Sequence, residues 1–275
     1  MPAPAPRSAE EASLADALAP IRADPARSAI LLDVDGTLAP IVRHAEDAHV
    51  PEPTRAPLIQ IGKRYKLVAC VSGRQAAIAR RIVSLGSIAY VGNHGSELLR
   101  PGSTEPEIEP DVAAYGRRVK AFADRSWTEE LHRLRVRAED KAVIAAYHWR
   151  GAPDEDAAES AVREIAAAAE AEGFVTHWGR KVLEVRPPVP LDKGRGIQRL
   201  LRGTELDAAI YVGDDRTDLD AFRALREEVA AGRLQSAACV GVRSDETPDE
   251  LAAEADMLVD GPKGVRELLL ALLDA

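Results

Sequence analysis

The chain has 275 residues, and 36 lysines and arginines against 45 acidic residues give a formal net charge of −9 at pH 7. Hydrophobic residues make up 46% of the sequence and charged residues 29%, which excludes a disordered chain and suits a globular protein with one large or two smaller domains. The acidic balance argues against nucleic-acid binding, which needs a basic face. No apolar run approaches the about 20 residues of a membrane span.

The N-terminal sequence MPAPAPRSAEEASL has no apolar segment of the kind that signal peptides carry. It predicts a frayed Pro/Ala tail followed by a short helix over 9–19. Both cysteines, Cys70 and Cys239, lie in apolar runs, so we expect buried thiols rather than a disulfide, in a reducing compartment. We therefore expect a cytoplasmic monomer that binds neither nucleic acid nor a membrane.

Apolar runs that end in polar residues recur along the chain and predict strands of a parallel sheet buried on both faces. Helical patterns follow them, such as QAAIARRIVSLG after the second run and the last helix near 264–273. This alternation predicts an α/β fold with a doubly wound, Rossmann-like parallel sheet, whose ligands bind beyond the carboxyl ends of the strands. The predicted strands cover 29–34, 67–71, 88–91, 208–212 and 237–242.

The pattern changes over 102–187, which predicts a separate inserted domain with an open-faced α/β sheet. The sheet domain is then formed by 1–101 and 188–275, with 1–27 partly disordered or a short helix, and Pro-rich hinges join the two parts. In chain order we expect a linker over 101–110, a helix over 110–124, strands over 135–138 and 142–150 around a turn at 139–141, a helix over 154–172, and strands over 174–177 and 181–186.

The sequence DVDGTL at 33–38 directly follows the first predicted strand. Two carboxylates so close at a strand end, Asp33 and Asp35, are costly unless a cation neutralises them, and their hard oxygens suit Mg²⁺. One carboxylate can act as a nucleophile and the other as a general acid and base. We expect Gly36 and Thr37 to turn the chain and to hold phosphate oxygens with backbone N–H groups. The alternative is an N-cap or turn role for the aspartates.

Four motifs in this order resemble those of the haloacid dehalogenase superfamily of phosphatases, and the resemblance covers the chain from Ser28 onward. They are DVDGTL at 33–38, VSGR at 71–74, LDKG at 191–194 and GDDRTDLDAF at 213–222.

The resemblance implies a role for each motif. Asp33 is the nucleophile, Asp35 the general acid and base, Ser72 a phosphate ligand and Lys193 the cation that stabilises the nucleophile and the phosphoryl charge. A cation there has a physical reason, because a phosphoryl transition state spreads negative charge over its oxygens. Taken alone, Ser72 is more often a helix N-cap and Lys193 a solvated surface residue.

The same resemblance implies a Mg²⁺ site. Asp33, Asp35 and Asp214 are the expected ligands, with Asp218 supporting the ion through water. The alternative for the acids of GDDRTDLDAF is an acidic helix start that matches the helix dipole.

Further motifs resemble the trehalose-6-phosphate phosphatase family. They are VGNHGSEL at 91–98, EDK at 139–141, HWR at 148–150, GRKVLEVRPP at 179–188 and GDDRTD at 213–218. The resemblance implies hydrolysis of trehalose 6-phosphate to trehalose and phosphate through an aspartyl-phosphate, in trehalose biosynthesis. It also implies that 1–101 and 188–275 form the catalytic core and that the inserted domain over 102–187 is a cap.

Strand alternation in the insert places polar side chains on one face. His148, Arg150, Arg180 and Glu184 share the face opposite the apolar positions, and we expect them to bind the sugar hydroxyls as donors and acceptors. The alternative is a solvated face with cross-strand ion pairs. A twist at the preceding glycine would exchange Arg180 and Lys181.

Three more polar residues follow core strands. Asn93 and His94, in the GNHG loop, are expected to contact substrate or the cap, although a lone histidine is usually structural. Arg74 is expected to meet the sugar, with a salt bridge inside the core as the alternative.

Two alternatives to the trehalose-phosphate substrate remain. One is another sugar-phosphate phosphatase of this branch, acting on sucrose-phosphate or a glycosyl-phosphoglycerate. The other is a catalytically dead domain that binds a sugar phosphate, but such a domain is expected to lose Asp33, Asp35 or the acids at 214 and 218, all of which are present.

Overall fold

The computed structural model describes residues 9–42, 45–245 and 247–274, so the predicted frayed tail over residues 1–8 lies outside the described part. The chain divides into two compact units, the first formed by 1–107 and 191–275 and the second by 108–190. The sequence placed the insert at 102–187, and its role as a cap stays a prediction. No described helix is long and apolar enough to cross a membrane.

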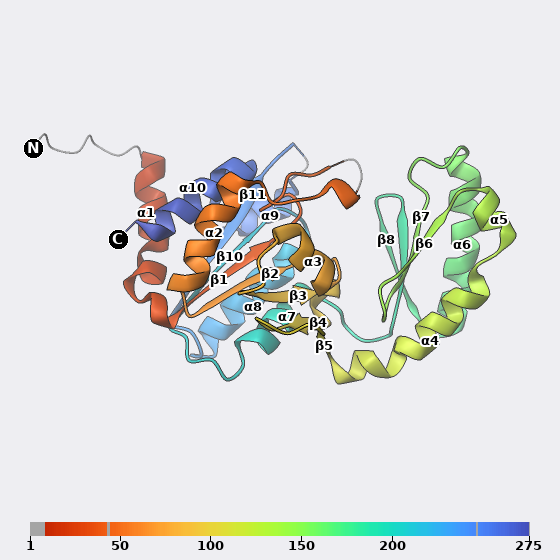
Figure 1. The fold of residues 1–275 in the computed structure, drawn as a ribbon, viewed down its shortest axis with the longest axis horizontal. Coiled ribbons are helices and arrows are strands. Elements are labelled where there is room, and N and C mark those ends of the chain that lie inside the picture. Colours follow the sequence, from red (N-terminus) through yellow and green to blue (C-terminus); the bar gives the residue numbers. More distant parts are fainter. Residues whose placement is uncertain (1–8, 43–44, 246, 275) are drawn as a thin grey trace, which may run out of the picture. The chain divides into compact units, whose positions relative to one another are not determined.

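The first unit contains an eight-stranded sheet in the order β12-β11-β10-β1-β2-β3-β4-β5 (Figure 1). Neighbouring strands from β12 through β3 are parallel, and β4 runs antiparallel to β3. The bounds are β1 Ser28–Asp33, β2 Leu67–Val71, β3 Ala89–Gly92, β4 Glu97–Leu99, β5 Glu107–Ile108, β10 Ala208–Gly213, β11 Ser236–Arg243 and β12 Met257–Asp260.

Helices cover both faces of this sheet, as Figure 1 shows for α2 and α10 on one side and α7 and α8 on the other. Along β1, Ile30 and Leu32 join the first apolar layer and Ala29 and Leu31 join the second. Burial on both faces explains the continuous apolar strand sequence and confirms the predicted doubly wound sheet. The helices are α1 Ala9–Ala23, α2 Glu52–Arg64, α3 Ala76–Val83, α7 Lys193–Leu201, α8 Asp218–Ala230, α9 Asp249–Glu254 and α10 Gly261–Leu273.

The order β10-β1-β2-β3 explains why polar segments far apart in the sequence meet. These strands are adjacent and parallel, so their carboxyl ends lie at one edge of the sheet. Asp33 ends β1, Ser72 follows β2, the 3₁₀ turn Asn93–Gly95 follows β3, and Asp214 follows β10.

The second unit is an antiparallel sheet in the order β6-β7-β9-β8, with helices packed on one face, as the sequence predicted. Tyr147, Trp149, Leu183 and Val185 point into this apolar layer. The elements are α4 Pro110–Ser126, α5 Glu129–Arg133, β6 Arg137–Asp140, β7 Ala145–His148, α6 Glu155–Ala171, β8 Val175–Gly179 and β9 Val182–Arg186.

The turn predicted at 139–141 is displaced. β6 continues to Asp140, and the turn lies at 141–144, where Lys141 N donates to the Ile144 carbonyl at 2.9 Å. The Asp140 carboxylate accepts from Ala142 N at 2.7 Å, and Ala142 has a φ of 64°. An aspartate at the last position of a strand can accept from a backbone N–H group two residues further on and so start the turn. The turn-favouring residues at 139–141 therefore did not show at which residue the strand ends.

Gly92 allows β3 to lie directly against the start of α3. A Cβ at this position would overlap the backbone nitrogen of Ala76, whereas a Cβ at Gly86 would have no atom within 4 Å. We expect Gly92→Ala to lower the free energy of unfolding by about 1–3 kcal/mol because the helix must move. Gly86→Ala is the control and should leave stability nearly unchanged. Equal denaturant midpoints for the two variants would contradict this packing argument.

Candidate active site

An acidic group lies at the carboxyl edge of the core sheet. Carboxylate oxygens of Asp33, Asp214 and Asp218 lie within 4.8 Å of one another, and Asp33 and Asp218 are buried. Burial raises the pKa of Asp33 well above its ordinary value, against the opposing charge of Lys193. Burial, together with the charges of Asp218 and Asp215, raises the pKa of Asp214 to about 7. Four acids at this edge therefore require a compensating positive charge.

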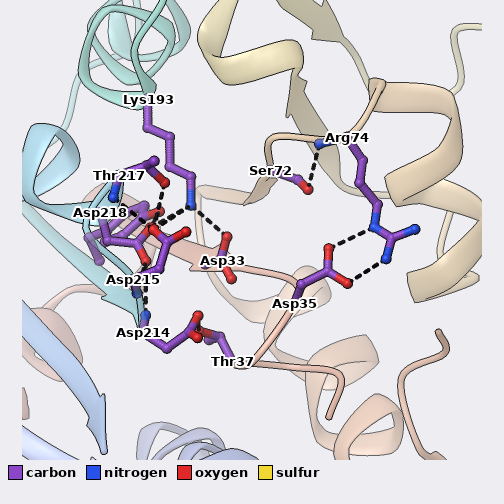
Figure 2. Close-up of polar contacts among 11 residues, drawn as sticks. Asp33, Asp35, Thr37, Ser72, Arg74, Lys193, Asp214, Asp215, Thr217 and Asp218 are labelled. Carbon is purple, nitrogen blue, oxygen red and sulfur yellow. Dashed lines mark hydrogen bonds and ion pairs between the residues drawn. The ribbon is translucent and has the colours of Figure 1, made fainter. Parts of the chain in front are cut away.

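Lys193 supplies part of that charge. It is the first residue of α7 and is 2% exposed, and Figure 2 shows its side chain pointing into the acidic group. Its Nζ donates to Asp33 Oδ1 at 2.7 Å and to Asp218 Oδ1 at 2.6 Å. Burial lowers the pKa of Lys193, but the carboxylates of Asp218 and Asp33 outweigh burial and hold it well above its ordinary value. The ammonium thus stays charged inside the protein.

The turn after Asp35 and the loop after β10 meet. Thr37 Oγ1 donates to Asp214 Oδ1 at 3.2 Å. Gly36 has a φ of 90°, and a Cβ there would overlap the Asp214 carboxylate. Only glycine combines this conformation with this close approach. The predicted phosphate-binding turn therefore lies against the predicted metal ligand.

The acidic group fits a magnesium ion. Asp33 Oδ2 is buried and has no hydrogen-bond partner among the described residues, although Oδ1 of the same carboxylate is held by Lys193. Carboxylate oxygens are the hard ligands that Mg²⁺ prefers. Asp35 does not belong to this group of three, so its predicted role as a ligand stays a prediction.

Asp35 instead forms an ion pair with Arg74 (Figure 2). The guanidinium donates to both carboxylate oxygens, at 2.7 Å from Nε and 2.8 Å from Nη2. Arg74 N also donates to Ser72 Oγ at 3.1 Å, and Ser72 is buried. The sequence left two interactions open for Arg74, a contact with the sugar and a salt bridge inside the core. The structure contains the salt bridge, and the sugar contact stays a prediction.

Asn93 and His94 lie in the turn after β3 with positive φ values of 46° and 52°. Asn93 is fully buried, and its Nδ2 donates to Glu97 Oε1 at 2.6 Å. Glu97 Oε2 accepts from Ala76 N, the first residue of α3, at 2.7 Å. The turn is thereby tied to the helix that follows Ser72 and Arg74. Glu97 lies within the VGNHGSEL motif but was not among the predicted site residues, because the sequence does not show which groups its carboxylate contacts.

In the second unit, Glu184 on β9 is buried between two cations. Lys141 Nζ donates to Glu184 Oε1 at 2.8 Å, and Arg186 Nη2 donates to Oε2 at 2.5 Å. His177 lies opposite Glu184 in the pairing of β8 with β9. Lys141 and Arg186 were not among the predicted site residues, because the alternation of a strand shows which side chains share a face but not which of them touch.

The other predicted sugar ligands are more dispersed. His148 Nε2 lies 2.9 Å from Glu139 Oε2, and Arg150 Nη2 donates to the Arg180 carbonyl at 3.0 Å. Lys181 forms an ion pair of 3.1 Å with the first residue of α6, so it is directed at the helical layer. The structure brings Glu184 into a charged cluster, and the sugar contacts of all four predicted residues stay predictions.

The comparisons with known proteins agree with this site. Residues 31–255 match the trehalose-phosphatase family. Trehalose 6-phosphate phosphatase RA3 of Zea mays is 29% identical over 261 residues, which cover 88% of this chain and 69% of that protein. Probable trehalose-phosphate phosphatase D of Arabidopsis thaliana is 29% identical over 72% of this chain and 57% of its own length. An uncharacterized glycosyl hydrolase of Mycobacterium tuberculosis is 31% identical over 73% of this chain, which spans only 15% of that protein.

Solved structures share the fold. A trehalose-6-phosphate phosphatase related protein has a TM-score of 0.68 and 25% identity, covering 89% of this chain and 97% of its own. The C-terminal domain of the C. albicans trehalose-6-phosphate phosphatase has a TM-score of 0.72 and 23% identity, covering 98% and 99%. The match to the family extends over most of the chain and includes the whole acidic group, and it confirms the resemblance. The chain belongs to the trehalose-phosphatase family.

Proposed function

We propose that this protein is a Mg²⁺-dependent phosphatase that hydrolyses trehalose 6-phosphate to trehalose and phosphate through an aspartyl-phosphate. The observation that carries the proposal is the position of Lys193 between Asp33 and Asp218, beside Asp214, in a member of the trehalose-phosphatase family. We also propose that it acts as a cytoplasmic monomer in trehalose biosynthesis. Its two cysteines are free, buried thiols, which suits a reducing compartment.

The reaction proceeds in two steps. An Asp33 oxygen bonds to phosphorus while the bond from phosphorus to the sugar oxygen breaks, and Asp35 gives its proton to that oxygen. Water then attacks phosphorus, Asp35 takes back a proton from the water, and the bond between Asp33 and phosphorus breaks. Lys193 stabilises the charge that spreads over the phosphoryl oxygens, and Ser72 holds the phosphate.

The ion pair between Asp35 and Arg74 has a consequence for this sequence of events. Both oxygens of the Asp35 carboxylate accept from the Arg74 guanidinium, but the leaving oxygen needs a proton from Asp35. The pair must therefore separate when substrate binds. Arg74 could then turn toward the sugar, which is the contact expected from the sequence.

Magnesium would be held by Asp33, Asp214 and, as the resemblance implies, Asp35, and would neutralise part of the phosphoryl charge. Asp218, whose oxygens already accept from the protein, would support the site by its charge. The buried oxygen of Asp33 without a partner and the hard donor set support this assignment. Gly36 and Thr37 form the surroundings of the phosphate, and Asn93 and His94, after β3, are the proposed contacts to substrate or the cap.

The polar face of the insert is the proposed sugar site. Two cations fix the Glu184 carboxylate, with Lys141 Nζ donating to Oε1 and Arg186 Nε and Nη2 donating to Oε2. A carboxylate held in one place in this way is a suitable acceptor for a sugar hydroxyl. His148, Arg150 and Arg180 add donors on the insert. A closing cap would exclude water from the reaction. Sucrose-phosphate and a glycosyl-phosphoglycerate carry the same kinds of groups, so a substrate panel decides between them.

Replacing the nucleophile tests the core of the proposal. Asp33→Asn should reduce turnover to background, because an amide cannot form the acyl phosphate. Phosphate release is measured, and far-UV circular dichroism confirms folding. Asp207→Asn is the matched control. Asp207 directly precedes β10, at the edge of the sheet opposite the acidic group, and binds Arg27, so this variant should retain activity. An Asp33→Asn enzyme with more than about a few per cent of wild-type turnover would rule out this nucleophile.

The metal requirement is tested by removal and return. A chelator should stop phosphate release, and added Mg²⁺ should restore it. Asp214→Asn should raise the Mg²⁺ concentration for half-maximal rate by at least about tenfold. Full activity in the presence of chelator would contradict the metal requirement. An unchanged Mg²⁺ requirement in Asp214→Asn would show that Asp214 is not a metal ligand.

Sugar recognition is tested on two substrates. Glu184→Ala should lower kcat/KM for trehalose 6-phosphate about tenfold to a hundredfold, because a lost contact leaves polar groups unpaired. Hydrolysis of p-nitrophenyl phosphate, which has no sugar, should barely change. Glu184→Gln keeps the size of the side chain and one acceptor oxygen beside one of the two cations, so it separates loss of the side chain from loss of its charge. Glu159→Ala, on α6, is the control.

Equal losses on both substrates would mean that Glu184 supports the fold or the shared chemistry. No loss on either would mean that the polar face of the insert is only solvated.

A further inference from the structure

Tyr211 brings a hydroxyl group into the acidic site from within a strand. It lies in β10 and is fully buried, and its Oη donates to Asp218 Oδ1 at 2.5 Å. Its ring packs edge-on against Phe222 of α8, with 6.0 Å between the ring centroids. The strand and the helix hold the ring from both sides, so the hydroxyl has a fixed place.

The Asp218 carboxylate is fully occupied by donors of the protein itself. Oδ1 accepts from Lys193 and Tyr211, and Oδ2 accepts from the backbone N–H groups of Asp214 and Asp215 at 2.8 and 2.9 Å. Four donors match the about four lone-pair sites of a carboxylate. Asp33 differs, because its Oδ2 has no partner among the described residues. Asp218 therefore acts as an anchor for the site.

Lys193 is shared between two carboxylates at nearly equal distances, 2.7 Å to Asp33 and 2.6 Å to Asp218. The place of its ammonium depends on how strongly each carboxylate attracts it. The Tyr211 hydroxyl is a second donor to Asp218 Oδ1. It takes up part of the hydrogen-bonding capacity of that oxygen and so weakens the attraction of the oxygen for Lys193.

We propose that Tyr211 is a positioning residue for the reaction, which keeps Lys193 on Asp33 by satisfying Asp218. The proposal rests on the proposed role of Asp33 as nucleophile. Without the hydroxyl, Asp218 Oδ1 keeps Lys193 as its only donor and draws the ammonium away from Asp33. The chemical step then slows, while groups that bind the substrate are untouched.

The experiment compares Tyr211→Phe with Tyr90→Phe. Tyr90 is also fully buried in this sheet, and its hydroxyl donates at 2.5 Å to the Leu85 carbonyl, away from the acidic group. We expect kcat of Tyr211→Phe to fall about tenfold to a hundredfold, the range for a hydrogen bond to a charged group, with KM within about twofold. The loss should be equal for trehalose 6-phosphate and p-nitrophenyl phosphate. Tyr90→Phe should keep its kcat even where its melting temperature falls.

An unchanged kcat in Tyr211→Phe would overturn the proposal, as would a loss confined to trehalose 6-phosphate or carried by KM. Crystal structures of both proteins give a readout without activity. The Lys193 Nζ to Asp33 Oδ1 distance should exceed 3.5 Å in the variant, and an unchanged hydrogen bond there would also overturn the proposal. Failure of the substrate assignment is separable, because a wild-type enzyme active only on p-nitrophenyl phosphate still reports on Tyr211.

Discussion

The buried ammonium of Lys193 is the interaction on which the rest of the site depends. An unpaired charge in this position would cost several kcal/mol, so the lysine and the carboxylates around it hold one another in place. Asp33 comes from the end of β1, Lys193 from the start of α7 and Asp218 from the start of α8. These elements meet because β1 and β10 are parallel neighbours and α7 and α8 cover the same face. These ion pairs therefore join β1, α7 and α8 at the sheet edge, in addition to the apolar layers that pack the same elements together.

The sequence was enough to predict the parallel sheet, because burial on both faces requires continuous apolar runs and leaves a strong pattern. It also indicated Asp33 and Asp214, since polar residues directly after such runs must meet at one sheet edge. Lys193 follows no such run, and only the resemblance of its LDKG motif to the haloacid dehalogenase superfamily indicated it. The same continuous apolar pattern gave no indication of a role for Tyr211. A tyrosine within an apolar strand is expected to be a packing residue, and only the contact with Asp218 shows that its hydroxyl has a polar partner.

Side-chain partners were the part that the sequence did not determine. For Arg74 the sequence favoured a sugar contact over a salt bridge inside the core, whereas the structure contains the salt bridge to Asp35. The alternation in β9 placed Glu184 on a polar face, but its enclosure by Lys141 and Arg186 follows from the displaced turn at 141–144 and from the rotamers. The alternation of side chains along a strand shows on which face of the sheet a residue lies. The partners of its side chain depend on neighbouring strands and turns, which the sequence of that strand does not specify.

The charge of the core site supports the proposed requirement for a metal ion. Asp35 is neutralised by Arg74, which leaves Asp33, Asp214, Asp215 and Asp218 against the single ammonium of Lys193. A phosphate monoester is itself a dianion near neutral pH and would be repelled by this surplus. One lysine cannot both hold Asp33 and offset an incoming phosphate. A divalent cation beside Asp33 Oδ2 and Asp214 would offset most of this surplus and would present a positive centre to the phosphate oxygens, so acids that disfavour phosphate by themselves would help to bind it.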